Sequence, residues 1–535
     1  MKKWIAVLLC IALLTVSTGL LLPSAGAAEF CDCNCVPVIR LTGGQGALTE
    51  NFGTPEEKSY YGMDMLENLQ RDLVPALDGL KESLLTFNPS KIVDALIATF
   101  FAWVGPLALN PDGTGVYAEL DRYDFEKEYT MSRGHKEPGL FYSFPFDWRR
   151  SPLEIADKLN DFVQDIKVHT GHEHVNIEGL SGSCAVLIAY TDKYVNGAEH
   201  PDAQSIVIGY SAASGTQLFG EFLNASIHFN PKNLGMLDII YITEDIDEEV
   251  SGTIVGVANA LYYLGIMDVL VAALSFFPEA AGERIYEELI RKTYASFPGI
   301  WSWVSPEDYD AAKARLIDGH PEYQDAGFLD KIDSYRAMQD RIPDILKEAN
   351  EKIKVAVMVG YNMALVPAGR GENSYLNSDV MVTVEKASLG AIAAPYGKTL
   401  GKNYKQVIND GHNHVSPDNV IDASTGALPE NTWYIKNSPH RVMYDYGGWY
   451  WWWKDAPKGE DTVFSNPDYP QYMQMLKKNQ NDKDPLIPVT AEPETFTSLF
   501  LGFWDELLFL FRALLERTLA PLRTALNESF WSIWF

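Results

Sequence analysis

The stretch Val175-Asn176-Ile177-Glu178-Gly179-Leu180-Ser181-Gly182-Ser183-Cys184-Ala185 decides the fold of this chain. Residues 175–180 have the apolar, β-branched pattern of a short buried strand, and residues 182–194 have the pattern of a helix that follows at once. Small residues surround Ser181, so the strand and the helix can approach each other closely around a tight turn. We therefore predict a strand–turn–helix unit with Ser181 on the turn; residues 179–183 are called the elbow below.

Strands and helices alternate on both sides of the elbow. Residues 152–168 have helical spacing, and no repeat of 20–50 residues occurs. The predicted strands are residues 37–41, 139–146, 175–180, 205–209, 353–360 and 432–435. Such alternation predicts an α/β fold with a mostly parallel central sheet, whose ligand sites lie at the carboxyl ends of the strands.

Length and charge narrow the classes of function. The 535 residues are enough for a large core, and the 47% of apolar residues argue against wholesale disorder. The formal net charge of −29 would repel DNA and RNA, so we expect no nucleic-acid partner.

The N-terminus has the layout of a secretory signal peptide. Lys2 and Lys3 precede an apolar run from Trp4 to Leu22, and small residues follow at 23–28. We predict a signal peptide of residues 1–27, with cleavage after Ala28 and an uncleaved anchor helix as alternatives. The mature protein is then expected to be secreted, or associated with the cell envelope.

Three cysteines follow the predicted cleavage site. Cys31, Cys33 and Cys35 are spaced C-x-C-x-C, and no second pair of ligands follows at zinc spacing. We therefore predict no metal site here. The sequence leaves two states open for these cysteines: a disulfide within the segment, or free thiols.

The rest of the chain divides by composition. Residues 28–214 and 351–475 are predicted to form the two parts of the core, and residues 215–350 a helical cap or lid insertion. Inside the insertion, residues 253–277 are almost wholly apolar, so a membrane span is the alternative to a lid helix. Residues 476–494 are predicted to be a linker.

Residues 495–535 are predicted to form amphipathic helices. Charged residues recur among their Leu, Phe and Trp residues, which argues against a transmembrane segment. The helices are expected either to pack on the main domain or to bind peripherally to a membrane or a partner.

A serine at such an elbow suggests a nucleophile, which needs a base, a group that orients the base, and donors for an oxyanion. Ser183 is a poor alternative nucleophile, because Ser181 would replace the glycine two residues before it. The predicted oxyanion donors are the N–H groups of Gly182 and Gly44, with Gln45 as an alternative to Gly44. Gly44 belongs to the glycine-rich loop at residues 42–46, which follows the first core strand.

The acid and the base are expected after later strands. Asp379 lies in a turn before an apolar segment and is the predicted acid, with Glu385 as the alternative. His440 ends a strand that runs into a loop and is the predicted base. His412 and His414 lie in a polar loop with no strand immediately before it, and His414 is the main alternative.

The order Ser181, Asp379, His440 is that of α/β-hydrolases, and the surrounding motifs resemble bacterial relatives of lecithin:cholesterol acyltransferase and related lipases. The motifs that carry this resemblance are residues 37–46, Phe146-Asp147-Trp148-Arg149, the elbow, Phe297-Pro298-Gly299-Ile300-Trp301 with Pro306, residues 378–385, and Thr432-Trp433-Tyr434 leading to His440. The resemblance covers roughly residues 36–475. It implies an α/β-hydrolase fold with a lid or cap, a lipid ester substrate and no cofactor.

The elbow departs from the pattern of this family, which is Gly-His-Ser-x-Gly-Gly. Leu180 stands in place of the histidine, and Ser183-Cys184 replace the two glycines. We therefore expect a secreted lipase or esterase that cleaves or transfers acyl groups, with a catalytically silent protein that binds lipid or an envelope partner as the alternative. An ion pair between Asp147 and Arg149 is expected to hold a loop beside the site.

Overall fold

The computed structural model describes residues 36–41, 48–50, 56, 58–61, 86, 90–116, 141–226, 283–284, 286–365, 376–440, 447–475 and 486–490. The predicted signal peptide, the three N-terminal cysteines, the apolar segment 253–277 and the C-terminal helices lie outside these residues. Within the described part of the chain, no helix is both long enough and apolar enough to span a membrane.

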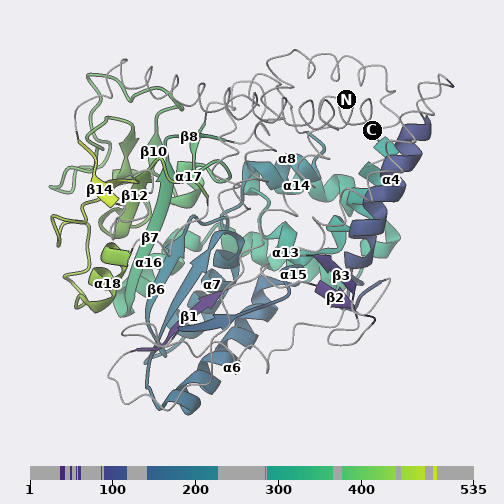
Figure 1. Cartoon of the computed structure of the whole chain (residues 1–535), viewed down its shortest axis with the longest axis horizontal. Coiled ribbons are helices and arrows are strands. Elements are labelled where there is room, and N and C mark those ends of the chain that lie inside the picture. The colour runs from purple at the N-terminus through teal and green to yellow at the C-terminus, as the bar shows by residue number, and fades with distance from the viewer. Residues whose placement is uncertain are drawn as a thin grey trace, which may run out of the picture. The chain divides into compact units, whose positions relative to one another are not determined.

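A sheet of eight strands forms the centre of the fold (Figure 1). Its order is β14 (Leu486–Pro488), β13 (Tyr472–Met475), β12 (Thr432–Lys436), β7 (Lys354–Tyr361), β6 (Ala203–Gly209), β5 (Val175–Leu180), β1 (Val38–Leu41) and β4 (Phe141–Phe144). All neighbouring strands are parallel except β14, which is antiparallel to β13. The prediction of a mostly parallel α/β sheet is confirmed, and all six predicted strands are present.

The two strands at one edge were not predicted. β13 and β14 are short, and β14 lies inside residues 476–494, which the sequence indicated to be a linker. A strand of three residues that contains a proline carries too little periodicity to be recognised, and it forms here because β13 supplies its partners.

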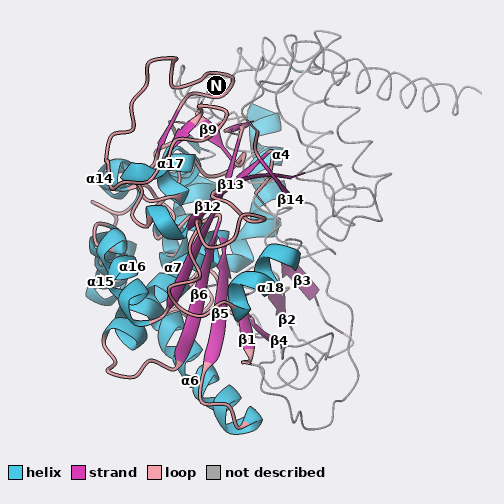
Figure 2. Ribbon diagram, turned by 90° about the vertical axis from the view of Figure 1, so that its left-hand side faces the viewer, coloured by secondary structure: helices cyan, strands magenta, loops and turns pink. Residues whose placement is uncertain are grey.

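Helices cover both faces of the sheet (Figure 2). They are α4 (Ser90–Val104), α6 (Pro152–Thr170), α7 (Cys184–Tyr190), α8 (Gln217–Leu223), α13 (Pro298–Trp301), α14 (Pro306–Leu316), α15 (Ala326–Gln339), α16 (Ile342–Lys352), α17 (Val384–Ala387) and α18 (Gly447–Asp455). Alternate residues of a strand face opposite sides. Val355 and Val357 of β7 accordingly pack in the core that α6, α7 and α16 cover, whereas Ala356 and Met358 pack against α18.

The described part of the predicted insertion 215–350 is helical. It includes α8 and α13 to α16. Side chains from its last two helices, Tyr335, Ile342 and Leu346, are buried in the main core with the sheet residues. This part of the insertion therefore helps to form one face of the sheet.

The join between β5 and α7 explains one of the elbow glycines. A Cβ atom at Gly179 would lie 3.0 Å from Cδ2 of Leu187 and 3.4 Å from Cα of Cys184. Because strand and helix pack this closely, a larger residue here would push against the Leu187 side chain. The close packing places Ser181 directly at the carboxyl end of a central strand.

Candidate active site

Ser181 occupies a strained position between β5 and α7. Its φ is +56°, which is uncommon for a residue other than glycine. Strained backbone of this kind occurs mainly at functional sites, where the surrounding structure holds it. The turn leaves Ser181 half-buried at the carboxyl edge of the sheet, with its Oγ 2.6 Å from Nε2 of His440.

Ser183 holds the elbow together. Its hydroxyl accepts a hydrogen bond from the N–H of Leu180 at 2.9 Å and donates one to the carbonyl of Leu180 at 2.8 Å. With a φ of −68°, Ser183 does not need the freedom of glycine. Ser183 thus fastens the turn, and its hydroxyl already has two partners.

Cys184 replaces the second glycine of the family pattern. Its thiol is fully buried and donates to the carbonyl of Gly209 at 3.5 Å. Burial raises the pKa of this thiol to about 12, so it is a poor nucleophile at neutral pH.

Gly182 carries the N–H group that the sequence predicts as an oxyanion donor. Its N–H lies in the first helical turn, where backbone donors have no partner within the helix. The carbonyls on both sides of this residue are held: Ala212 N–H donates to Ser181 O at 3.2 Å, and Trp303 Nε1–H donates to Gly182 O at 3.2 Å. The direction of the Gly182 N–H is therefore set before any ligand binds. Gly44 and Gln45 lie outside the described residues.

His440 and Asp379 complete a chain of hydrogen bonds that begins at Ser181. His440 follows β12, and its Nδ1 lies 2.8 Å from Oδ2 of Asp379. An ionised carboxylate only accepts, so Nδ1 carries a proton and Nε2 is left to accept the Ser181 hydroxyl proton. The structure thus brings together the three side chains that the sequence selected as nucleophile, acid and base.

Asp379 is held rigidly. It is fully buried after β9 (Asn377–Ser378), and its Oδ1 accepts the N–H groups of Met381 at 2.9 Å and Val382 at 2.7 Å. The intervening Val380 has a φ of +88°, a strained value for a β-branched residue. With Oδ1 occupied by backbone donors, Oδ2 is directed at the imidazole.

The residues that the sequence offered as alternatives to Asp379 and His440 have other partners. Glu385 is exposed on α17. His414 is fully buried, with Nδ1 3.0 Å from Gln471 Oε1 and Nε2 2.9 Å from Asp410 Oδ2. His412 stacks on Phe464, with ring centroids 4.3 Å apart. Both ring nitrogens of His414 are therefore used to hold its own loop.

The expected pair of Asp147 and Arg149 is present. Arg149 donates from Nε and Nη2 to the two carboxylate oxygens of Asp147 at 2.9 and 2.8 Å, and from Nη1 to the carbonyl of Leu107 at 2.7 Å. Burial alone would raise the pKa of Asp147, but the charge and hydrogen bonds of Arg149 outweigh it and the net pKa shift is downward. The pair fixes the loop that carries Trp148.

An aromatic cluster lies beside the elbow. Trp303 stacks on Trp148 at 6.1 Å between ring centroids and packs against Phe219 at 4.9 Å. A Cβ atom at Gly182 would lie 2.4 Å from the Trp303 ring, so this cluster contacts the residue after Ser181. Sequence analysis missed Trp303, although it lies two residues after the motif that ends at Trp301.

Gly360 was also missed. It is the penultimate residue of β7. A Cβ atom there would lie 2.6 Å from Ser438 O, 2.6 Å from Tyr210 Cε1 and 2.7 Å from Asp379 Cβ. Its position at the carboxyl end of a predicted strand is the sequence feature that could have indicated this role. Its missing side chain allows the acid and the histidine loop to approach each other.

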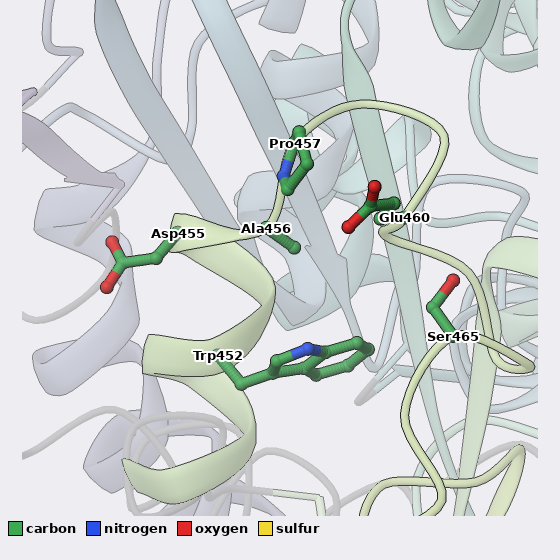
Figure 3. Close-up of a pocket in the computed structure, with 6 residues that line it drawn as sticks. All are labelled: Trp452, Asp455, Ala456, Pro457, Glu460 and Ser465. Carbon is green, nitrogen blue, oxygen red and sulfur yellow. The ribbon is translucent and has the colours of Figure 1, made fainter.

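A cavity of about 500 Å³ lies elsewhere in the molecule (Figure 3). It is lined by Trp452, Asp455, Ala456, Pro457, Glu460 and Ser465. Lys354, the first residue of β7, donates to the carbonyls of Trp453 and Ala456 beside it. The cavity is thus at the amino end of the strands, whereas the Ser181 site is at their carboxyl end.

Among the described residues, no cluster of His, Cys, Asp or Glu is suited to hold a metal ion.

No family model matches the chain, and no curated protein matches it at a significant level.

We predict that Gly360→Ala lowers the free energy of unfolding by about 1–3 kcal/mol, because the added methyl group meets backbone and ring atoms that have little room to move. Urea denaturation measures the change. The matched variant is Gly327→Ala at an exposed position in the first turn of α15, where the one atom within 4 Å of the added methyl group is Oδ1 of Asp325 at 3.1 Å. Equal effects of the two variants would contradict the close packing at Gly360.

Proposed function

We propose that this protein is a serine hydrolase of the α/β-hydrolase type that acts on lipid esters. One observation carries the proposal: the hydrogen bonds from Ser181 Oγ to His440 and from His440 to Asp379, built on an elbow with φ of +56°. The sequence order of the three residues and the motifs shared with the lecithin:cholesterol acyltransferase relatives support the same class.

In the proposed reaction, Ser181 Oγ attacks the ester carbonyl while His440 Nε2 takes its proton. Asp379 holds the imidazole in the required tautomer and stabilises the imidazolium that forms. The Gly182 N–H stabilises the tetrahedral oxyanion, with Gly44 as the expected second donor. His440 then returns the proton to the leaving alcohol, and water or a second alcohol releases the acyl group from Ser181.

The lipid part of the proposal rests on the surroundings of the elbow. Trp303, Trp148 and Phe219 give the site an aromatic wall next to Gly182, which suits the apolar chain of an ester better than a charged group. The sequence supports the same preference, because residues 253–277 are almost wholly apolar and residues 495–535 have an amphipathic pattern that suits contact with lipid.

We expect a fluorophosphonate probe to label the wild-type protein on Ser181, because an activated serine attacks such a probe. Ser181→Ala should abolish the labelling and lower ester hydrolysis by at least about 10³-fold. Intact-protein mass spectrometry with peptide mapping locates the label. Ser334→Ala makes the same chemical change on the surface of α15 and should label normally. Lack of labelling of the folded wild type, with and without lipid vesicles, would refute the proposal.

We expect Asp379→Asn to lower kcat by about 10³- to 10⁴-fold with little change in folding, because the amide no longer selects the imidazole tautomer. The matched variant Glu385→Gln makes the same change at the exposed carboxylate that the sequence offered as an alternative. Steady-state kinetics on a soluble ester compares the two. A larger loss in Glu385→Gln would reverse the assignment.

A series of p-nitrophenyl esters tests the substrate class. We expect kcat/KM to rise by up to about 15-fold with each added pair of methylene groups, because burial of one CH₂ contributes about 0.8 kcal/mol. Product analysis with an added long-chain alcohol separates transfer from hydrolysis. Rates independent of chain length would leave a serine esterase but exclude the lipid preference. Vesicle binding without turnover, unchanged in Ser181→Ala, would instead favour the silent lipid-binding protein.

A further inference from the structure

Tyr210 is an unusual residue at the same edge of the sheet. It directly follows β6, is fully buried, and has a φ of +48°. The left-handed conformation costs an L-residue roughly 1–2 kcal/mol. A bulky aromatic residue occupies this position although glycine would adopt the conformation without strain, so we looked for a specific task of its side chain.

The hydroxyl group of Tyr210 meets that of Ser438. The two oxygen atoms are 2.6 Å apart, and both side chains are fully buried. The Tyr210 ring also packs at 83° to the imidazole of His440, with ring centroids 6.2 Å apart. Tyr210 therefore contacts the histidine ring directly and, through Ser438, the segment that carries it.

That segment is anchored along its length. Asn437 has a φ of +58°, its N–H donates to Tyr361 O at 2.9 Å, and its side-chain oxygen accepts from Asn362 Nδ2 at 2.7 Å. Ser438 is the next residue and lies two positions before His440. Among the described residues, the Tyr210–Ser438 contact is thus the side-chain anchor closest in sequence to the histidine.

We infer that Tyr210 and Ser438 are positioning residues: their buried hydroxyl pair holds His440 in line between Asp379 and Ser181. The inference rests on the proposed function of the Ser181 site. It has a clear physical basis, because a reacting group displaced by about 1 Å can lose about 10²-fold in rate. Removing either hydroxyl breaks this buried hydrogen bond, so the loop that carries His440 is expected to shift.

The test compares Tyr210→Phe, Ser438→Ala and the double variant, all in the full chain. Each single change should lower kcat on a short p-nitrophenyl ester by about 10- to 100-fold and leave KM within about twofold. The double variant should be no slower than the slower single variant, because the two hydroxyls act as one unit. Ser438→Thr, which keeps the hydroxyl, should recover most of the rate.

Tyr361→Phe is the matched control. Tyr361 is also fully buried at the carboxyl end of a strand, but its hydroxyl donates to Asp418 Oδ2 at 3.1 Å, away from the histidine. It should destabilise the protein to a comparable extent and leave kcat within about twofold. Equal losses of kcat in Tyr210→Phe and Tyr361→Phe, or multiplicative losses in the double variant, would overturn the inference.

A readout independent of turnover separates this inference from the proposed function. The Nδ1–H proton that His440 shares with Asp379 should give a strongly downfield ¹H signal, identified by its absence in His440→Gln. The signal should shift or broaden in Tyr210→Phe and stay unchanged in Tyr361→Phe. The wild-type protein could show the ¹H signal but neither react with the fluorophosphonate probe nor hydrolyse esters. That result would refute the proposed hydrolase function, and the signal would still test the Tyr210–Ser438 pair. An unchanged signal in Tyr210→Phe would overturn the pair itself.

Discussion

The backbone must turn from a buried strand into a helix within one residue, Ser181, and most of the site depends on this constraint. The turn is made with a left-handed conformation at Ser181, whose φ is +56°. Its free-energy cost is offset by neighbouring contacts: the Ser183 hydroxyl fastens Leu180, Ala212 holds the Ser181 carbonyl, and Gly179 lets β5 and α7 pack together. A strained residue held in this way presents its side chain in one direction.

The same kind of strain recurs along the carboxyl edge of the sheet. Eight described residues other than glycine have a positive φ, and four of them directly follow strands of the central sheet: Ser181, Tyr210, Asn362 and Asn437. The parallel strands end side by side at this edge, so the side chains after them are crowded into one place. The sheet beneath is rigid enough to hold several unfavourable conformations at once. This arrangement holds the Ser181, His440 and Asp379 side chains in fixed positions.

The departures of the elbow from the lipase pattern have a physical account. Ser183 uses its hydroxyl within the turn, and Cys184 fills a buried position against Gly209. Neither replacement disturbs the hydrogen bonds of Ser181, so the altered motif gives no structural reason to expect inactivity. Its local role is to tighten the turn, while the aromatic cluster around Trp303 borders the position after the serine.

The sequence by itself determined the parallel sheet and the three residues of the candidate site. Periodicity along β5 and β7, small residues around Ser181, and the order of a carboxylate and a histidine after later strands are local or sequential signals that a single chain displays. Only the tertiary structure decided the roles of Gly360, Trp303, Tyr210 and Ser438. The contact between Tyr210 and Ser438 joins residues 228 positions apart, and Gly360 matters because residues that follow three other strands meet it. β13 and β14 were missed for the same reason, since a short strand is defined by its neighbour rather than by its own residues.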